Sequence, residues 1–263
     1  MIVDVHTHIF PDDIAERVVK QLSAAGSVPA YLNGTLAALI ASMDKAGIDV
    51  SVIAPVATKP SQVRSINDFS ASVAGDRIVP FGTLHPDFEP VETEVKRMKE
   101  VGVRGIKLHS EYQEFHPDDE RLYPMYEVLE WAGFVVLFHA GYDVEIPTLH
   151  SSPDRFARLH QAFPKLRVIL AHLGSWRMWD EVEEHLVGKD VYFDTSYIFD
   201  DIGLEQFRRI VANHPPGRVL FGTDSPWTDQ SVEVGRLRGS GLDRDTVDRI
   251  LGENARRLLW VTS

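Results

Sequence analysis

Short apolar runs recur along the whole chain, and amphipathic segments separate them. Each run is rich in Val, Ile and Phe and is nearly continuous rather than alternating. Continuous apolar runs of this length are typical of parallel strands that are buried on both faces. The sequence therefore predicts eight parallel strands, at residues 2–5, 50–54, 78–81, 105–108, 134–138, 168–171, 191–193 and 218–221.

The segments between these runs have helical periodicity. Three of them, 36–46, 91–101 and 122–131, lead into a glycine that suits a helix C-terminus: Gly47, Gly102 and Gly133. Near the C-terminus, apolar residues trace one helical face after Asp243, which we expect to be an N-cap. The segment 23–34 contains two glycines and a proline and is expected to form a loop or lid.

Eight strands alternating with helices in 263 residues predict a (β/α)8 TIM barrel that forms one domain over residues 1–263. A doubly wound open sheet is the alternative. That fold would place a glycine-rich phosphate-binding turn after the first strand, whereas this strand continues into His-Thr-His. The barrel is therefore favoured.

The charge balance and the absence of cysteine narrow the range of partners. The chain has 27 Lys+Arg against 39 Asp+Glu, a net charge of −12, which disfavours nucleic acid as a partner. With no cysteine, a metal must be held by His, Asp, Glu or a modified Lys. No apolar run is long enough to span a membrane, and the N-terminus has the character of a strand rather than a signal peptide. We expect a cytoplasmic protein with a small-molecule substrate; a homodimer is a general expectation.

Five polar residues lie at the ends of four predicted strands, and these ends would meet at one rim of the barrel. His6 and His8 end the first strand, His139 and His172 follow the fifth and sixth, and Asp224 follows the eighth. Taken singly, each has an ordinary structural explanation, as an exposed or hydrogen-bonded histidine or as an N-cap aspartate. Their common placement at the strand ends where barrel active sites lie predicts a metal site.

The fourth strand ends with Lys107 and His109, which share a face. Lys107 is interpreted as a cation for the substrate, as a lysine of lowered pKa, as a carboxylated bridge between two metals, or as a partner of Glu111. The residues after other strands predict an aromatic, partly apolar pocket mouth, unless the tryptophans simply pack loops. The predicted substrate-binding residues are Lys107, His109, Glu111, Tyr142, Trp176 and Trp227.

An ordered set of segments resembles the amidohydrolase superfamily, in particular its compact metal-dependent branch that includes aminocarboxymuconate semialdehyde decarboxylase and related aromatic-acid decarboxylases. The segments are 4–8 (DVHTH), 105–109 (GIKLH), 135–141 (VVLFHAG), 171–174 (AHLG) and 219–226 (VLFGTDSP). Single fragments are weak, but the set occurs in order along the whole chain and is specific for the superfamily. It is much less specific for the reaction.

The resemblance implies a role for each matching position. One divalent ion, with Zn²⁺ the first expectation and Mn²⁺ the alternative, would be held by His6, His8, His139 and Asp224. His172 would act as the catalytic acid and base, and Asp224 would also take part in proton transfer. If Lys107 is carboxylated, the resemblance implies two ions instead, with His139 and His172 both as ligands.

Four functions remain open on the sequence. We expect a metal-dependent hydrolase of a small ester, lactone or amide that uses a metal-activated water. The alternative is a non-oxidative decarboxylase of a small aromatic or conjugated acid, with Lys107, Arg155 or Arg177 holding a carboxylate. Barrel nucleases of the TatD type carry a glutamate where this chain has Lys107, and a non-catalytic barrel would be expected to have lost metal ligands, so both are disfavoured.

Overall fold

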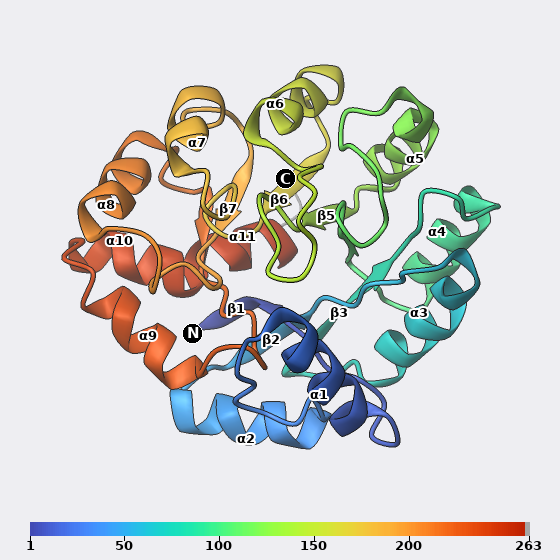
Figure 1. Ribbon diagram of the computed structural model, residues 1–263, viewed down its shortest axis with the longest axis horizontal. Helices are drawn as coiled ribbons and strands as arrows, with labels where there is room; N and C mark the ends of the chain where they lie inside the picture. Colours follow the sequence, from blue (N-terminus) through green and yellow to red (C-terminus); the bar gives the residue numbers. More distant parts are fainter. Residues whose placement is uncertain (261–263) are drawn as a thin grey trace.

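Eight parallel strands form one barrel at the centre of the protein (Figure 1). The computed structural model describes residues 1–260. Neighbouring strands pair in the order of the sequence, which confirms the predicted (β/α)8 TIM barrel. The strands are β1 (Val3–Thr7), β2 (Val50–Ile53), β3 (Ile78–Thr83), β4 (Gly105–Leu108), β5 (Val135–Phe138), β6 (Arg167–Leu170), β7 (Tyr192–Asp194) and β8 (Val219–Leu220).

Three backbone hydrogen bonds join the last strand region to the first, one of them from the N–H of His8 to the carbonyl of Ser225 at 2.7 Å. The N–H of Val5 donates to the carbonyl of Phe221 at 2.9 Å, and the N–H of Asp224 donates to the carbonyl of His6 at 2.8 Å. The pairing of β1 with β2 is irregular between Asp4 and Thr7. Such irregularities redirect side chains, and His6 lies within this one.

Helices surround the barrel, and Figure 1 shows α2 to α9 following one another around it. None of the helices described in residues 1–260 is long and apolar enough to cross a bilayer. The helices are α1 (Ala15–Gly26), α2 (Leu36–Ala46), η1 (Pro60–Gln62), α3 (Val63–Ser72), α4 (Val91–Glu100), η2 (Glu120–Leu122), α5 (Tyr123–Ala132), α6 (Pro153–Ala162), α7 (Trp179–His185), α8 (Leu204–Asn213), α9 (Gln230–Arg238), α10 (Arg244–Asp248), η3 (Arg249–Glu253) and α11 (Asn254–Trp260).

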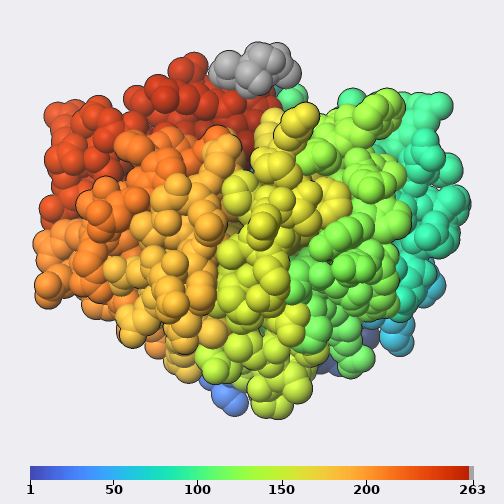
Figure 2. All heavy atoms as spheres, turned by 90° about the horizontal axis from the view of Figure 1, so that it is seen from above, coloured from blue at the N-terminus to red at the C-terminus, as the bar shows by residue number. Residues whose placement is uncertain are grey.

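The strands are nearly continuous in apolar residues because both of their faces are buried. On β5, Val135 and Leu137 belong to an interior cluster that includes Leu258 of α11. Val136 and Phe138 belong to the larger cluster between strands and helices. In Figure 2 the red C-terminal segment lies at one end of the molecule, and the yellow-green segment after β5 projects at the other. The predicted site residues lie at this second end.

The helix ends follow the sequence signals in most places. Gly47 and Gly133 adopt left-handed conformations after α2 and α5, and the Asp243 carboxylate accepts a hydrogen bond from the Thr246 N–H. The prediction of a loop over residues 23–34 is wrong at its start. Residues 23–26 form the last turn of α1, because Ser-Ala-Ala continues a helix readily and the chain leaves it only at Ser27, whose φ is 53°.

The loop after β5 approaches the loop after β6 at Gly141. Gly141 has a φ of 91° and pairs with Trp176 as an isolated parallel bridge. A Cβ atom at this position would lie 2.3 Å from the Trp176 nitrogen and 2.5 Å from its carbonyl oxygen. Both the backbone conformation and the close approach therefore require glycine.

We predict that Gly141→Ala is much more destabilising than Gly47→Ala. Gly47 also has a positive φ, 70°, but a Cβ there would meet nothing within 4 Å. Its substitution should cost only the conformational penalty of roughly 1–2 kcal/mol. Gly141→Ala should add an overpacking cost of roughly 1–3 kcal/mol. Urea unfolding of the two variants measures the difference, and equal free energies of unfolding would contradict the close approach.

Candidate functional site

Three ligand atoms from the two ends of the chain converge at the rim of the barrel. His6 on β1, His8 just after it and Asp224 after β8 each offer one atom, all within 4.8 Å of one another. Asp224 Oδ1 lies 2.9 Å from His8 Nε2 and 3.4 Å from His6 Nε2. Two imidazoles and one carboxylate form a donor set that suits a catalytic divalent ion with further positions open. These residues therefore fit the predicted metal.

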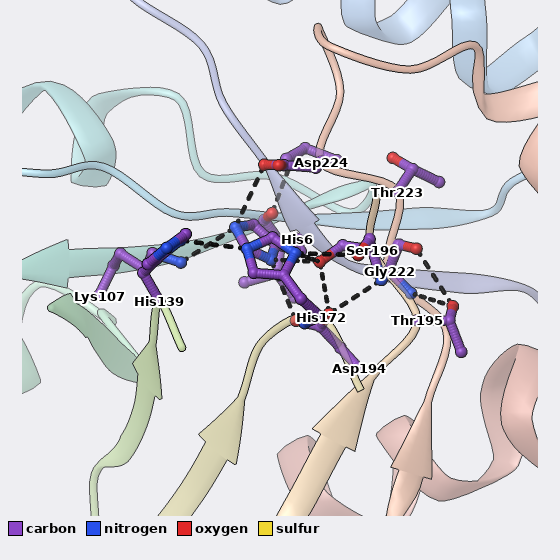
Figure 3. A network of polar contacts seen from close by, with 12 residues as sticks. His6, Lys107, His139, His172, Asp194, Thr195, Ser196, Gly222, Thr223 and Asp224 are labelled. Carbon is purple, nitrogen blue, oxygen red and sulfur yellow. Dashed lines mark hydrogen bonds and ion pairs between the residues drawn. The ribbon is translucent and has the colours of Figure 1, made fainter. Parts of the chain in front are cut away.

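Asp194, the last residue of β7, fixes the orientation of His6. Its Oδ2 lies 3.0 Å from His6 Nδ1, and both side chains are buried (Figure 3). Burial alone would raise the pKa of Asp194, but His6, together with His172 and the Ser196 hydroxyl, outweighs it and holds the pKa well below its usual value. An ionised Asp194 accepts the Nδ1 proton, which leaves the Nε2 lone pair of His6 for a cation. This is the carboxylate–histidine arrangement typical of metal sites.

The same carboxylate also supports His172. Asp194 Oδ1 accepts hydrogen bonds from the backbone N–H groups of His172 at 3.1 Å and Ser196 at 2.9 Å. His172 and Leu173 have φ values of 62° and 56°, in the left-handed region that these residue types rarely adopt. Asp194 therefore stabilises the strained turn that presents His172.

His172 and His139 form a chain of hydrogen bonds between two carbonyl groups. His172 Nδ1 lies 2.9 Å from the Ser196 carbonyl, His172 Nε2 lies 3.1 Å from His139 Nδ1, and His139 Nε2 lies 3.1 Å from the Tyr142 carbonyl. Carbonyls only accept, so three protons would satisfy the three contacts, whereas two neutral imidazoles carry two. Burial, then His172 and Lys107, lower the pKa of His139. One further proton, placed between His172 Nε2 and His139 Nδ1, would therefore satisfy the third contact, and burial of His139 opposes its uptake.

Lys107 of β4 points at His6 across the barrel interior. Its Nζ lies 3.0 Å from His6 Nε2, and its side chain is buried (Figure 3). Burial lowers the pKa of Lys107 to about 8 and that of His6 to about 4. The Nε2 lone pair of His6 can accept a hydrogen bond from Lys107 or bind a cation, but not both. A metal at His6 therefore requires Lys107 to move or to lose a proton.

A second group of ligand atoms lies beside the first. One atom from each of His109, His139 and Asp143 lies within 4.8 Å of the other two. The rings of His109 and His139 stack with centroids 4.1 Å apart, and His109 Nε2 lies 3.6 Å from Asp143 Oδ2. In the structure, the possible ligand atoms nearest to that of His139 thus come from His109 and Asp143. The sequence predicted His139 as a ligand of the same ion as His6, His8 and Asp224.

The predicted rim residues have different surroundings. Glu111 is buried, and its Oε1 accepts hydrogen bonds from Ser151 Oγ and from the N–H groups of His150 and Ser151, so it anchors the loop after β5. Tyr142 and Trp176 line a cavity of about 720 Å³. Trp227 lies in the turn after Asp224 and is half-buried. Its backbone N–H donates a hydrogen bond to the Asp224 carbonyl.

Asp194, Ser196 and Asp143 were not predicted as site residues. Asp194 and Ser196 lie in Asp-Thr-Ser at the end of the seventh apolar run. The same test that found Asp224, a carboxylate directly after a buried strand, applies to Asp194. Asp143 lies four residues beyond His139 in a loop, where nothing in the sequence distinguishes it from other surface acids.

Comparisons with known proteins agree with this fold. Residues 3–260 match the protein-family model described as amidohydrolase. An uncharacterised TIM-barrel protein from Bordetella bronchiseptica has a TM-score of 0.79, with 21% identity over 98% of each chain. A dihydroxybenzoic acid decarboxylase from Polaromonas, with bound manganese and the inhibitor 2-nitroresorcinol, has a TM-score of 0.74, with 17% identity over 98% of this chain and 96% of that one. At these identities the likeness shows the fold alone.

One curated relative matches over a short stretch. A dihydroorotase from Helicobacter pylori is 31% identical over 103 residues, which make up 35% of this chain. The match spans 30% of the dihydroorotase itself. The resemblance predicted from the motifs is confirmed at the level of the family.

We predict that Asp194→Asn lowers the affinity for a divalent metal. Asparagine cannot accept from His6 Nδ1 and two backbone N–H groups as the carboxylate does, and loss of such a partner typically costs about 10- to 100-fold in affinity. Zinc titration against a competing chelator measures the change.

The matched control is Thr195→Val. Thr195 is buried next to Asp194, and its hydroxyl exchanges hydrogen bonds with the Gly222 backbone rather than with a histidine. Its metal affinity should equal that of the unmodified protein. Equal losses in both variants would show a general loosening of the barrel rim instead of a role for the carboxylate.

Proposed function

The chain belongs to the amidohydrolase family and is an enzyme of that family, and from this premise we propose that it hydrolyses a small ester, lactone or amide. The observation that carries the proposal is the convergence of His6, His8 and Asp224 beside a histidine pair that can accept a proton. Hydrolysis needs both a group that polarises the carbonyl and a group that moves a proton.

We propose that His6, His8 and Asp224 hold a divalent ion. When bound, the ion would polarise the substrate carbonyl and lower the pKa of water. Asp194 would keep the Nε2 lone pair of His6 available by accepting its Nδ1 proton. Zn²⁺ suits two imidazoles and a carboxylate, and Mn²⁺ is the alternative.

His172 is the proposed acid and base. As the water oxygen bonds to the carbonyl carbon, His172 would take a proton from that water, and His139 together with the two flanking carbonyls would stabilise the extra proton. As the bond to the leaving oxygen or nitrogen breaks, His172 would return the proton to it. The products are an acid and an alcohol or amine, and no other reactant is consumed.

Lys107 has two proposed roles that differ in metal number. As an amine it would contact the substrate once an ion occupies His6. As a carbamate, formed with CO2, it would bridge two ions, with His139 and His172 as ligands. Its burial and its lowered pKa are compatible with both roles, and the metal content separates them.

We predict that His172→Gln lowers kcat by about 10²- to 10⁴-fold, the usual contribution of general acid–base catalysis, while metal content stays at about one ion per chain. The measurements are elemental mass spectrometry and turnover across a panel of esters, lactones and amides. His160→Gln, a like substitution on α6 away from the site, should leave both values unchanged. Two ions per chain in the unmodified protein, or loss of metal in the His172→Gln variant, would favour the binuclear arrangement.

A non-oxidative decarboxylase is the second candidate. The observation that favours it is Lys107, a buried cation beside His6 that could hold a carboxylate. The arginines named for this role are less available, since Arg155 pairs with Asp118 and Arg177 pairs with Asp201. The similarity to the dihydroxybenzoic acid decarboxylase from Polaromonas is a similarity of fold alone.

We predict that the metal-loaded enzyme releases no CO2 from aromatic or conjugated acids under conditions in which it cleaves an ester, lactone or amide. Hydrolysis should produce one titratable acid for each bond cleaved. Headspace CO2 measured beside acid release on the same enzyme preparation tests this. Release of CO2 without hydrolysis would make the decarboxylase the correct function.

A further inference from the structure

A cavity of about 720 Å³ adjoins the candidate site. Its wall includes Tyr142 and Asp143 after β5, Trp176 after β6 and Tyr197 after β7. Asp143 also belongs to the group with His109 and His139, and Ser196, the residue before Tyr197, accepts from His172. A substrate whose reacting bond lies at the site would therefore place its remaining part in this cavity.

The two cations in the cavity wall are already paired. Arg177 donates to Asp201 Oδ1 at 3.0 Å, and its guanidinium also lies over the Trp176 ring. Arg236 donates to Glu233 Oε1 at 3.0 Å and makes a second ion pair with Asp200. A carboxylate on the substrate would have to compete with these acids for the same guanidinium groups.

The wall has an excess of negative charge. It holds four carboxyl groups, from Asp143, Asp200, Asp201 and Glu233, against two guanidinium groups. Glu233 is 2% exposed, and within residues 1–260 its Oε2 has no hydrogen-bond partner. Asp143 Oδ1 accepts hydrogen bonds from two backbone N–H groups, and within residues 1–260 the ion-pair partner of Asp143 is His109, whose Nε2 lies 3.6 Å from Oδ2, rather than a lysine or an arginine.

Aromatic rings complete this wall. Trp176 and Tyr197 meet edge to face, with centroids 5.8 Å apart, and Tyr142 is partly exposed. Trp176 already carries a guanidinium at 4.1 Å from its ring centroid. Aromatic faces next to carboxylates attract cations and repel anions.

We propose that this cavity binds a positively charged ammonium group of the substrate, so that the enzyme prefers an ester, lactone or amide bearing an amine to one bearing a carboxylate. This inference rests on the proposed hydrolase function for the choice of scissile bond. The charge preference itself follows from the surplus carboxylates, the paired arginines and the aromatic wall.

Binding of three ligands of similar size tests the charge preference without turnover. The probes are benzylammonium, benzyl alcohol and benzoate, measured by calorimetry on the metal-loaded protein at pH 8. This pH lies above the value of about 7 to which burial raises the pKa of Glu233, and it keeps the amine protonated. Benzylammonium should bind about tenfold more tightly than benzyl alcohol, and benzoate most weakly. Tightest binding of benzoate would overturn the proposal.

Two variants assign the preference to the wall. Glu233→Gln should weaken the binding of benzylammonium several-fold and leave the binding of benzyl alcohol unchanged. Asp201→Asn should remove the ion pair that holds Arg177 and so strengthen the binding of benzoate. The control is Asp76→Asn, which makes the same change in net charge at an exposed residue just before β3, at the opposite end of the barrel. It should leave the binding of benzylammonium and of benzoate unchanged. An unchanged preference in both wall variants would overturn the assignment.

Turnover of an amine, alcohol and carboxylate series of otherwise identical esters separates this inference from the proposed function. Cleavage of all three at equal rates would support the hydrolase and overturn the charge preference. Preferential benzylammonium binding with cleavage of none would support the cavity assignment and contradict the hydrolase.

Discussion

The contact between Asp194 and His6 is the interaction on which the rest of the site depends. One buried carboxylate receives the Nδ1 proton of His6 and the backbone N–H groups of His172 and Ser196. It thereby connects the ends of β1, β6 and β7. A buried charge without partners costs free energy. The strand ends can therefore pack around Asp194 only if the imidazole and both N–H groups are placed to hydrogen-bond with it. The geometry that stabilises the charge also orients the Nε2 atom of His6, which we propose as a metal ligand.

The barrel keeps stability and chemistry at opposite ends. Leu258 and Leu259 of α11 pack with Val135, Leu137 and other interior residues near the bottom of the strands, where the side chains are apolar. Towards the other end, the interior positions are taken by Lys107, His6 and Asp194, all buried. The apolar end provides hydrophobic stabilisation, which offsets the cost of burying ionisable groups at the other.

The sequence predicts the strands well because burial on both faces leaves a continuous apolar run, as at 135–138. It also predicts which residues reach the rim, since parallel strands end at one edge. It does not predict how these residues are grouped. His139 stacks on His109 because β4 and β5 pair with Leu108 opposite Phe138, which brings the next residue of each strand together, and this register is not visible in the sequence. Asp194 directly follows a buried apolar run, as Asp224 does, so the sequence carries a signal for it, but not for its contact with His6, 188 residues away.

Burial acts differently on the ionisable groups of this region, and the difference defines where a cation is favoured. Burial raises the pKa of Glu111 to about 7 and lowers that of Lys107 to about 8. Asp194 is fully buried and the Asp224 side chain is 14% exposed, yet His6 and its neighbours keep the pKa of both low. Two permanent negative charges therefore flank His6, whose own burial disfavours a proton. An imidazole that resists protonation, between two carboxylates that stay ionised, is an environment that stabilises a divalent cation more than it stabilises a proton.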